Sequence, residues 1–468
     1  MKVLFLVHDN ITIPLGIGYI ASIVSELGHE ISTLSLNMKD LTDCVRDEAP
    51  DILAFGTTTG FHRKYSEVAK RLKEATGVLT IMGGAHPTFF PEVMEENPWL
   101  DFAMRGEAET AFPQFLEVLE GRRSIGDVGN LIYRENGQIL ENRILPLVED
   151  LDTIPFPQRN LLPGENKKAV FCITGRGCPY NCSYCFNQSY RQMYKGLGKY
   201  CRRRSVGNVI DELKELKEEN TELQMIIFQD DIFILDHDWV REFCQKYSGE
   251  IALPFHCHLR ANLVTDEIME LLAETGCISV KMALEAASSR LRKNVLNRDL
   301  SNEDLLNACR SVKQSGIMLV TQNILGIPTG TLEDDLDTLR MNYEVQPDFA
   351  FATLMQPYPR TRICEFSKEQ GLLDDETFIP DSFFDDCILK LPDNDRRKRL
   401  RQLFAISIEF KAVRYMLKIL MRLPLDGLYG FMDKLWKGYC IKQREFPYKL
   451  SFREYVSSML TYFSSRYY

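Results

Sequence analysis

The stretch 175-GRGCPYNCSYCFN-187 carries three cysteines, Cys178, Cys182 and Cys185, with the spacing C-x3-C-x2-C. Thiolates are soft ligands that select zinc, copper(I) or iron–sulfur clusters. A structural zinc site usually takes four protein ligands, often from two C-x-x-C pairs, and this chain has no second C-x-x-C. Three thiolates suit a cubane of four irons whose fourth iron has no cysteine ligand. The spacing therefore predicts a cluster with one open iron, which can bind a substrate or cofactor.

The region around this loop has the rhythm of a parallel β/α fold. Six strand candidates are separated by long helical segments, which predicts a partial (β/α)6 barrel; they are AVFCITG (169–175), MIIFQDD (225–231), PFHCHLR (254–260), CISVKMALE (277–285), MLVTQNILGIP (318–328) and FAFATLMQPYP (349–359). The cysteine loop follows the first candidate, which places it at the carboxyl ends of the strands, where such folds gather their chemistry. The other strands also end in polar or special residues, among them Arg176, Asp230, Asp231, Arg260, Glu285, Gly326 and Pro357.

The first 120 residues predict a separate sheet. Five short apolar runs without strict alternation read as strands buried on both faces, KVLFLVHD (2–9), EISTLSL (30–36), DILAFGT (51–57), GVLTIMGG (77–84) and FAMRGE (102–107). Helical patterns lie between them, so we predict a doubly wound parallel sheet of Rossmann-like type, whose ligands bind at the carboxyl ends of the strands.

The remaining segments complete the predicted domain organisation. NLIYRENGQILENRI (130–144) indicates a hairpin around Asn136-Gly137, and the proline-rich stretch 149–164 reads as an extended linker. We therefore expect domains at 1–125 and 168–385, a hairpin and linker at 126–167, and a helical region at 386–468. The basic and aromatic run 396–424 could be a membrane-surface helix, but a helical cap on the barrel is the simpler interpretation and the one we favour.

Composition narrows the class of protein. The 468 residues carry a net charge of −10 with 45% hydrophobic residues, which argues against a nucleic-acid surface. No apolar run reaches the ~18–20 residues of a membrane span, and the first residues lack a signal peptide's long apolar region. We expect a cytoplasmic protein whose thirteen cysteines form no disulfide framework; scattered ones such as Cys44, Cys244 and Cys309 read as core residues.

The cysteine loop CPYNCSYC (178–185), with Tyr184 before the last cysteine, resembles the signature of the radical S-adenosylmethionine (SAM) enzymes. Segments 228–236, 258–277, 283–298, 323–336 and 355–373 are similar to the same superfamily, so the likeness spans about 168–375. PLGIGYIASIVSELGHE (14–30), MGGAHPT (82–88) and RGEAE (105–109) resemble the cobalamin-binding domain that precedes the barrel in the cobalamin-dependent (class B methyltransferase-like) branch.

This resemblance implies roles for residues of the barrel. Cys178, Cys182 and Cys185 would hold a 4Fe-4S cluster whose open iron is chelated by SAM, which is cleaved to methionine and a 5′-deoxyadenosyl radical. Glu285 matches a strand-end glutamate that contacts SAM, although ALEAAS stands here where the family often has GxESGS. Arg260 could pair with the SAM carboxylate or form a surface ion pair. Gly326, Ile327 and Pro328 would approach adenine, and Phe186 either flanks adenine or belongs to the core.

The resemblance also implies a cobalamin site. Thr57, Thr58, Gly83, Gly84, His86, Gly106 and Glu107 follow strands where the corrin or its nucleotide tail would lie. No histidine here fits the D-x-H-x-x-G motif that ligates cobalt in many cobalamin proteins, so that lower ligand is absent and His86 is a candidate contact. A vestigial, empty domain is the alternative.

Two features stay open. Asp230 and Asp231 could orient a substrate or cap the following helix. His256, His258 and Arg260 share one strand face, and a polar barrel lining is a better interpretation than a metal site, which would want further ligands.

The first predicted function is methylation of an unactivated carbon or a phosphinate phosphorus, with the methyl group carried on cobalamin. The alternative is a radical reaction without methyl transfer, such as cyclisation, ring contraction or carbon–carbon coupling, with cobalamin redox-active or absent. A non-catalytic cluster or cobalamin carrier would not need six converging strand ends. We expect an oxygen-sensitive enzyme, an external one-electron donor such as flavodoxin or ferredoxin, and a small, lipid-like or peptide substrate.

Overall fold

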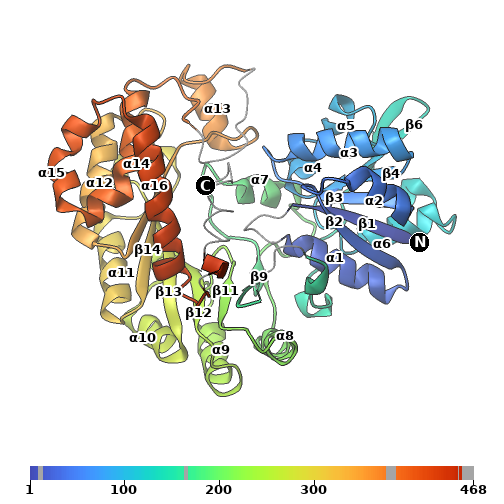
Figure 1. The fold of residues 1–468 in the computed structure, drawn as a ribbon, viewed down its shortest axis with the longest axis horizontal. Helices are drawn as coiled ribbons and strands as arrows, with labels where there is room; N and C mark the ends of the chain where they lie inside the picture. The colour runs from blue at the N-terminus through green and yellow to red at the C-terminus, as the bar shows by residue number, and fades with distance from the viewer. Residues whose placement is uncertain (9–13, 163–166, 376–385, 452, 456–468) are drawn as a thin grey trace. The chain divides into compact units, whose positions relative to one another are not determined.

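The computed structural model describes residues 1–8, 14–162, 167–375, 386–451 and 453–455. The chain forms two compact units, each with its own sheet and core (Figure 1). The first consists of residues 1–166 together with 189–204, and the second consists of the rest. The segment 189–204, which follows the cysteine loop in the sequence, therefore packs with the first unit.

The first unit is built on a seven-stranded sheet with the order β2-β1-β3-β4-β5-β6-β7. All five strands predicted in residues 1–120 are present and pair in parallel; they are β1 (Lys2–Val7), β2 (Glu30–Ser35), β3 (Ile52–Gly56), β4 (Leu79–Gly83) and β5 (Phe102–Met104). The chain moves to one side of β1 with β2 and to the other side with β3. This reversal is the switch point at which doubly wound sheets bind their ligands.

Helices cover both faces of this sheet because successive strand residues point to opposite sides. Leu4 and Leu6 pack towards α2 (Leu41–Glu48), α3 (His62–Thr76) and α5 (Val93–Glu96). Phe5 instead packs on Phe112 of α6 (Ala111–Leu119), which lies with α1 (Leu15–Glu26) on the other face. The short helix α4 (Ala85–Phe89) follows β4 directly.

The predicted hairpin is present, and it belongs to the sheet. β6 (Leu131–Glu135) and β7 (Gln138–Glu141) add two antiparallel strands beside β5. Asn136 and Gly137 both have positive φ, 52° and 80°, as a two-residue type I′ turn requires. The hairpin therefore closes the edge of the first unit's core.

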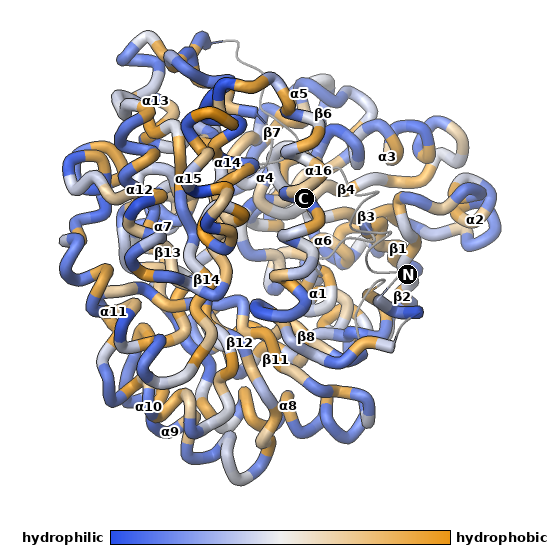
Figure 2. Tube along the Cα trace, turned by 60° about the vertical axis from the view of Figure 1, so that its left-hand side comes forward, coloured by the Kyte–Doolittle hydropathy of each residue, from blue (hydrophilic) through white to orange (hydrophobic). Residues whose placement is uncertain are grey.

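The second unit holds a six-stranded, all-parallel sheet with the order β15-β14-β13-β12-β11-β8. It confirms the six predicted strands: β8 (Ala169–Cys172), β11 (Met225–Phe228), β12 (Phe255–Leu259), β13 (Cys277–Glu285), β14 (Met318–Leu325) and β15 (Phe349–Leu354). Apolar colour runs along β11 in Figure 2, as expected for a strand buried on both faces. The crossover helices are α8 (Val206–Glu219), α9 (His237–Glu250), α10 (Asp266–Thr275), α11 (Asn302–Gln314) and α12 (Leu332–Val345).

The C-terminal region is helical, as predicted, and comprises α14 (Asn394–Glu409), α15 (Lys411–Leu420) and α16 (Asp426–Cys440), followed by a π-turn, η6 (Ile441–Glu445). Leu400, Leu403 and Phe404 of α14 join a core with β15 and α12, so α14 caps this edge of the barrel. Phe446 and Tyr448 pack on strand residues of β8 and β11 and cover the opposite face from helices α8 to α11. None of the described helices has the length and apolar content that crossing a bilayer requires.

A buried ion pair ties α14 to α12, and both of its members also bond to the loop after β14. The Arg397 guanidinium is fully buried and donates to the Asp335 carboxylate at 2.6 Å and to the Gly330 carbonyl at 3.1 Å. The other Asp335 oxygen accepts from the Gly326 backbone N–H at 2.9 Å. One carboxylate thus holds both the C-terminal cap and the Gly326 turn, which has φ +68°.

We predict that Arg397→Met destabilises the second unit by about 3–5 kcal/mol, because it leaves the Asp335 carboxylate buried without its counter-charge. Urea unfolding monitored by circular dichroism measures this change. Arg340→Met is the matched control, since Arg340 forms ion pairs with Asp337 and Glu333 at the surface and should cost at most about 1 kcal/mol. Equal effects of the two substitutions would contradict this role of the Asp335–Arg397 pair.

Candidate functional site

The cysteine loop lies between the short strand β9 (Gly175–Arg176) and α7 (Phe186–Met193). Its backbone is fixed by the segment after β13: the Ser183 N–H donates to the Leu296 carbonyl at 3.0 Å, and the Ser183 hydroxyl donates to the Val295 carbonyl at 2.6 Å. The Ser183 carbonyl accepts from the N–H of Ile363, in α13 (Arg362–Glu369), at 2.9 Å. Hydrogen bonds from two other segments of the second unit therefore hold the loop.

The environment of Cys182 is positively charged. Arg260, buried at the end of β12, stacks 3.5 Å above the Tyr180 ring and donates to Cys182 Sγ at 3.8 Å. Burial alone would lower the pKa of Arg298, but the nearby Tyr184, Glu285 and Cys182 raise it. Two guanidiniums facing Cys182 offset the negative charge that thiolates and a bound cluster bring. The surface-ion-pair alternative for Arg260 is wrong, because Arg260 is buried.

The three thiols fit a cluster better than a single ion. All thirteen cysteines are free thiols. Within the described residues, no three His, Cys, Asp or Glu side chains are grouped closely enough to hold one metal ion. A cubane needs a wider spacing, because each cysteine binds a different iron. Three free thiols in one loop, with two arginines near Cys182, are compatible with such a cluster.

Glu285 ends β13 in a strained conformation. Its φ is +65°, and the pairing of β13 with β14 shifts register between Ala283 and Glu285. The Tyr184 hydroxyl donates to Glu285 Oε1 at 2.6 Å. Burial raises the pKa of Glu285, while Arg298, the Tyr184 hydrogen bond and Arg260 oppose that shift. Non-glycine residues with positive φ persist where the surroundings enforce them, often at functional sites.

Other predicted residues of the second unit are placed as follows. Gly326 ends β14 in the turn fixed by Asp335, Ile327 is buried, and Pro328 continues the turn. Phe186 begins α7, with its ring 5.9 Å from that of Tyr358. A tilted pair of this kind leaves both the adenine and the core interpretations of Phe186 open.

Asp230 and Asp231 have different surroundings. Asp230 is buried and accepts from the Thr174 N–H and hydroxyl, the latter at 2.7 Å, so it joins the ends of β8 and β11. Asp231 accepts from the Asn187 side chain at 3.1 Å. The helix-capping alternative is wrong for both, because Asp236 caps α9 by accepting from the Asp238 and Trp239 N–H groups.

The hydrogen bonds of His256 and His258 fix their tautomers. His258 Nδ1 lies 3.1 Å from the Asp230 carbonyl, which only accepts, so Nδ1 carries the proton. Ser279 donates its one hydroxyl proton to the Glu445 carbonyl at 2.5 Å, so His256 Nδ1 must donate to that hydroxyl oxygen at 2.8 Å. Each ring therefore presents a bare Nε2, which is buried without a partner among the described residues. Two such nitrogens without a third ligand fit the predicted polar lining.

In the first unit, backbone hydrogen bonds assemble the switch-point residues. The Thr57 N–H donates to the Gly83 carbonyl, and the His86 N–H donates to the Thr57 carbonyl, both at 2.9 Å. Gly84 has φ +91°, and a Cβ there would lie 2.7 Å from the Thr57 backbone. At Gly83 a Cβ would meet nothing within 4 Å, so open space lies above the end of β4.

Two polar atoms at this switch point are orphaned. Thr57 Oγ1 and His86 Nε2 are buried without hydrogen-bond partners among the described residues. His86 stacks on His62 with ring centroids 3.6 Å apart, and burial, followed by His62 and Arg63, lowers the pKa of His86 to about 3. Buried polar atoms are rarely left unpaired in native proteins. These unpaired atoms, together with the open space at Gly83, fit a bound polar cofactor better than a vestigial, empty domain.

Thr58 follows Thr57 in the same loop, whereas Gly106 and Glu107 have structural partners. A Cβ at Gly106 would lie 1.9 Å from the Tyr194 hydroxyl, which explains the glycine. The Glu107 carboxylate forms a bidentate pair with Arg202 at 2.6 and 2.9 Å, which fixes the segment 189–204. Sequence reasoning missed Arg202, Tyr194, Arg298 and Tyr184 in these roles, since only folding brings them to their partners.

Comparisons with known proteins agree with this architecture. Residues 172–341 match the radical SAM superfamily, and residues 1–116 match the B12 binding domain. The uncharacterized methyltransferase PH0819 of Pyrococcus horikoshii is 30% identical over 375 residues, covering 77% of this chain and 79% of that protein. Cytidylyl-2-hydroxyethylphosphonate methyltransferase of Streptomyces wedmorensis is 24% identical, covering 82% and 84%. Anaerobic magnesium-protoporphyrin IX monomethyl ester cyclase of Rubrivivax gelatinosus is 26% identical, covering 74% and 64%.

Solved structures share the fold. The methyltransferase TsrM of Kitasatospora setae, with cobalamin and a [4Fe-4S] cluster bound, superposes with a TM-score of 0.65 at 15% identity, covering 79% of this chain and 78% of that one. The enzyme OxsB, with aqua-cobalamin and SAM bound, gives a TM-score of 0.70 at 14% identity, covering 99% and 83%. The site and the fold together define a radical SAM enzyme with a cobalamin-binding domain.

The chain belongs to the cobalamin-dependent radical SAM family, in the group that contains its methyltransferases. Its cofactors are a 4Fe-4S cluster, SAM and cobalamin, as the resemblance implied.

We predict that Cys182→Ala lowers the iron bound after anaerobic reconstitution from about four per chain to less than one, because two cysteines cannot hold the cubane. Iron and sulfide analysis measures this loss. Cys44→Ala is the matched control, since Cys44 is a half-buried thiol of the first unit and should leave the iron content unchanged. Full iron content in Cys182→Ala would contradict the assignment of this cysteine.

We predict that the free energy of unfolding of the first unit falls as pH drops below about 6.5. The unfolded chain binds a proton at His86 below this pH, whereas the folded chain does not bind it until about pH 3. This stabilisation is complete above pH 6.5, and its loss reaches about 2 kcal/mol at pH 5. Urea titrations at pH 7 and 5, read by pulsed hydrogen exchange in peptides from β1, β3 and β4, measure it. His86→Asn should reduce the pH dependence, and an unchanged dependence would refute it.

Proposed function

We propose that this enzyme methylates an unactivated carbon, or a phosphinate phosphorus, of its substrate. The observation that carries the proposal is the presence, in one chain, of a three-cysteine loop and of a switch point where Thr57 Oγ1 and His86 Nε2 are buried without a partner among the described residues and a Cβ at Gly83 would meet open space. Radical cleavage of SAM requires only the first site, whereas transfer of a methyl group carried on cobalamin requires both. The names of the two methyltransferase relatives also support methyl transfer.

When bound, the cluster supplies the electron that cleaves SAM, and cobalamin supplies the methyl carrier. Cys178, Cys182 and Cys185 would hold this cluster, which would in turn bind SAM. Arg260 and Arg298 stabilise negative charge at the cluster and the SAM carboxylate. Glu285, oriented by Tyr184, accepts hydrogen bonds from SAM, and the Gly326–Pro328 turn brings backbone near adenine.

In the first unit, Thr57, Thr58, Gly83, Gly84 and His86 would receive cobalamin. His86 is neutral at physiological pH because burial lowers its pKa to about 3, so it can offer a lone pair or an N–H to the cofactor. Gly83 leaves room for a flat ring, and Gly84 lets the Thr57 backbone approach closely. Contacts of Gly106 and Glu107 with cobalamin stay a prediction, because both residues have protein partners.

The net reaction requires a reductant. For each methyl group transferred, the substrate loses one hydrogen atom, and two SAM molecules with two electrons give S-adenosylhomocysteine, methionine and 5′-deoxyadenosine. A flavodoxin or ferredoxin is the kind of donor that supplies these electrons. The substrate would be a small molecule, a lipid or a peptide, with no nucleic acid involved, and the thirteen free thiols suit the reducing cytoplasm.

The cyclase relative supports a second candidate, a radical ring closure without methyl transfer. That reaction consumes SAM to 5′-deoxyadenosine and methionine and forms no S-adenosylhomocysteine. The ratio of S-adenosylhomocysteine to 5′-deoxyadenosine, measured by mass spectrometry during turnover, separates the two candidates. A ratio near one supports methyl transfer, and a ratio near zero supports ring closure.

We predict that Gly83→Leu lowers cobalamin retained after gel filtration from about one per chain to a tenth of that or less, because the new side chain fills the open space at the end of β4. Ultraviolet–visible spectra of the reconstituted chain measure cobalamin and cluster together, and the cluster band should not change. Gly126→Leu, also in open space of the first unit, is the matched control. Equal retention in both variants would count against this site, and a wild-type chain that retains no cobalamin would overturn the methyl-transfer proposal.

A further inference from the structure

The exposed apolar side chains of this protein are concentrated in one segment. Of the twelve large hydrophobic residues exposed among those that the structure describes, ten lie within 410–439, on and beside α15 and α16. The most exposed are Tyr415 at 83%, Ile419 at 58% and Phe431 at 55%. Single exposed apolar residues are ordinary, but large contiguous apolar patches on soluble proteins mark interaction sites. We call the exposed apolar side chains of 410–439 the C-terminal apolar face.

Packing among the residues that the structure describes does not account for this face. α15 has the sequence KAVRYMLKIL, and Leu417 is the one residue of this helix that is buried. Leu417, Met421 and Tyr429 join the core formed with α14 and β15, so the helices are anchored to the barrel. The favoured interpretation of this region as a cap thus holds for α14, whereas α15 turns most of its apolar residues outwards.

The charge of this segment is opposite to that of the chain. Residues 410–440 contain six Lys or Arg and two Asp, in a protein of net charge −10. Both aspartates are neutralised by pairs: Asp426 with Arg399 at 3.1 Å and Asp433 with the buried Lys437 at 2.8 Å. Lys411, Lys418 and Arg422 are exposed and make no ion pair with any residue that the structure describes. A basic apolar face therefore stands out from an acidic protein.

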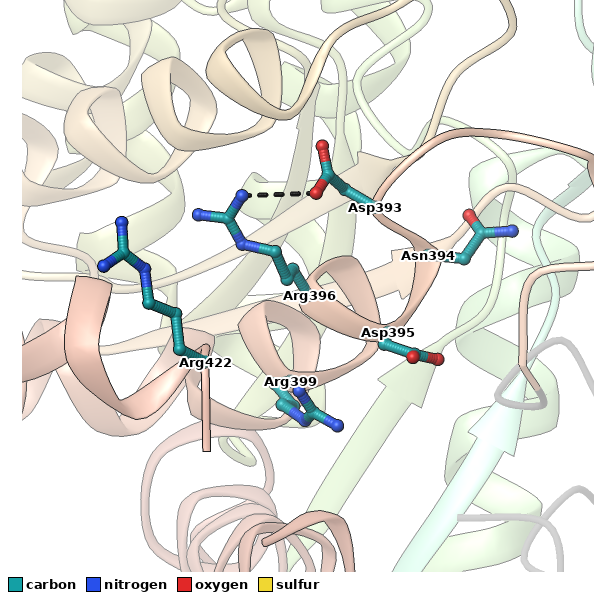
Figure 3. Close-up of a pocket in the computed structure, with 6 residues that line it drawn as sticks. All are labelled: Asp393, Asn394, Asp395, Arg396, Arg399 and Arg422. Atoms are coloured by element: carbon teal, nitrogen blue, oxygen red, sulfur yellow. Dashed lines mark hydrogen bonds and ion pairs between the residues drawn. The ribbon is translucent and has the colours of Figure 1, made fainter. Parts of the chain in front are cut away.

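A shallow pocket lies beside this face, between the start of α14 and the end of α15 (Figure 3). Figure 3 shows Arg396 and Arg422 extending in the same direction, away from Asp395. Arg396 pairs with Asp393 at 3.2 Å, and Arg399 is held by Asp426, which leaves the Arg422 guanidinium for an external anion. A phosphate group at the edge of an apolar surface is what a lipid headgroup presents.

We propose that the C-terminal apolar face binds the surface of an anionic lipid bilayer. The apolar side chains of α15 and α16 enter the boundary between headgroups and acyl chains, and Lys411, Lys418 and Arg422 contact the phosphates. No described helix is suited to crossing the bilayer, so the attachment is peripheral. This inference goes beyond the proposed reaction and does not depend on any cofactor.

The test is co-sedimentation of the full chain, without reconstitution, with vesicles of phosphatidylcholine alone or mixed equally with phosphatidylglycerol. The wild-type chain should bind the anionic vesicles at least tenfold more tightly than the neutral ones, and less tightly at high salt. The double variant I419D/F431D should weaken binding at least tenfold, and K418E/R422E several-fold. Leu27→Asp is the matched control, since Leu27 is 55% exposed in the first unit and should leave binding unchanged.

Other outcomes overturn the proposal. If the chain binds no vesicles but forms a dimer in analytical ultracentrifugation that I419D/F431D abolishes, the face is an interface between copies. If it binds no vesicles and stays monomeric, or if Leu27→Asp weakens binding as much as I419D/F431D does, the face has no lipid role. All substituted residues are exposed, so the variants should fold as the wild type does. Equal melting temperatures of the variants and the wild type check this. Because no cofactor is present, failure here leaves the proposed methyl transfer untouched.

Discussion

Parallel pairing of β-strands is the constraint on which both units depend. Each parallel strand must be reached by a crossover, so the parallel strands of a sheet all have their carboxyl ends on the same side. In the second unit this brings the ends of β8, β12, β13 and β14 together, and with them Arg260, Glu285 and Gly326. In the first unit the same rule gathers Thr57 and Gly83 at the switch point. Each site is therefore assembled from residues that lie far apart in the sequence.

Electrostatics then shapes the cluster site. Arg260 and Arg298 approach Cys182 from two different elements, and both are buried. Buried guanidiniums are costly unless they face negative charge. Thiolates carrying an iron–sulfur cluster supply that charge, which explains why two arginines occupy the same side of the loop. The Tyr184–Glu285 hydrogen bond fixes the carboxylate beside them, at a residue whose backbone is itself strained.

The interior of the barrel is closed by the end of the described chain. The Glu445 carboxylate pairs with Lys281 of β13, and Phe446 packs edge-on against His256 with ring centroids 5.0 Å apart. These contacts hold polar side chains in a buried place, where hydrogen-bond geometry fixes which imidazole nitrogen carries the proton. The C-terminal region thus has two separate tasks, because α14 and η6 complete the barrel while α15 faces outwards.

The sequence by itself determined the two sheets, the cysteine loop and the family. Their signals are local: apolar runs of strand length, turn residues such as Asn136-Gly137, and three cysteines within eight residues. The predicted site residues lie mostly at the carboxyl ends of strands, which is where parallel sheets bind their ligands. The partners of those residues were decided only by the tertiary structure. Glu107 meets Arg202, Asp335 meets Arg397, and Cys182 meets Arg298, each across a long stretch of chain. The sequence also could not predict that α15 leaves most of its apolar residues exposed. A helical pattern shows that an apolar stripe exists, but not whether the rest of the chain covers it.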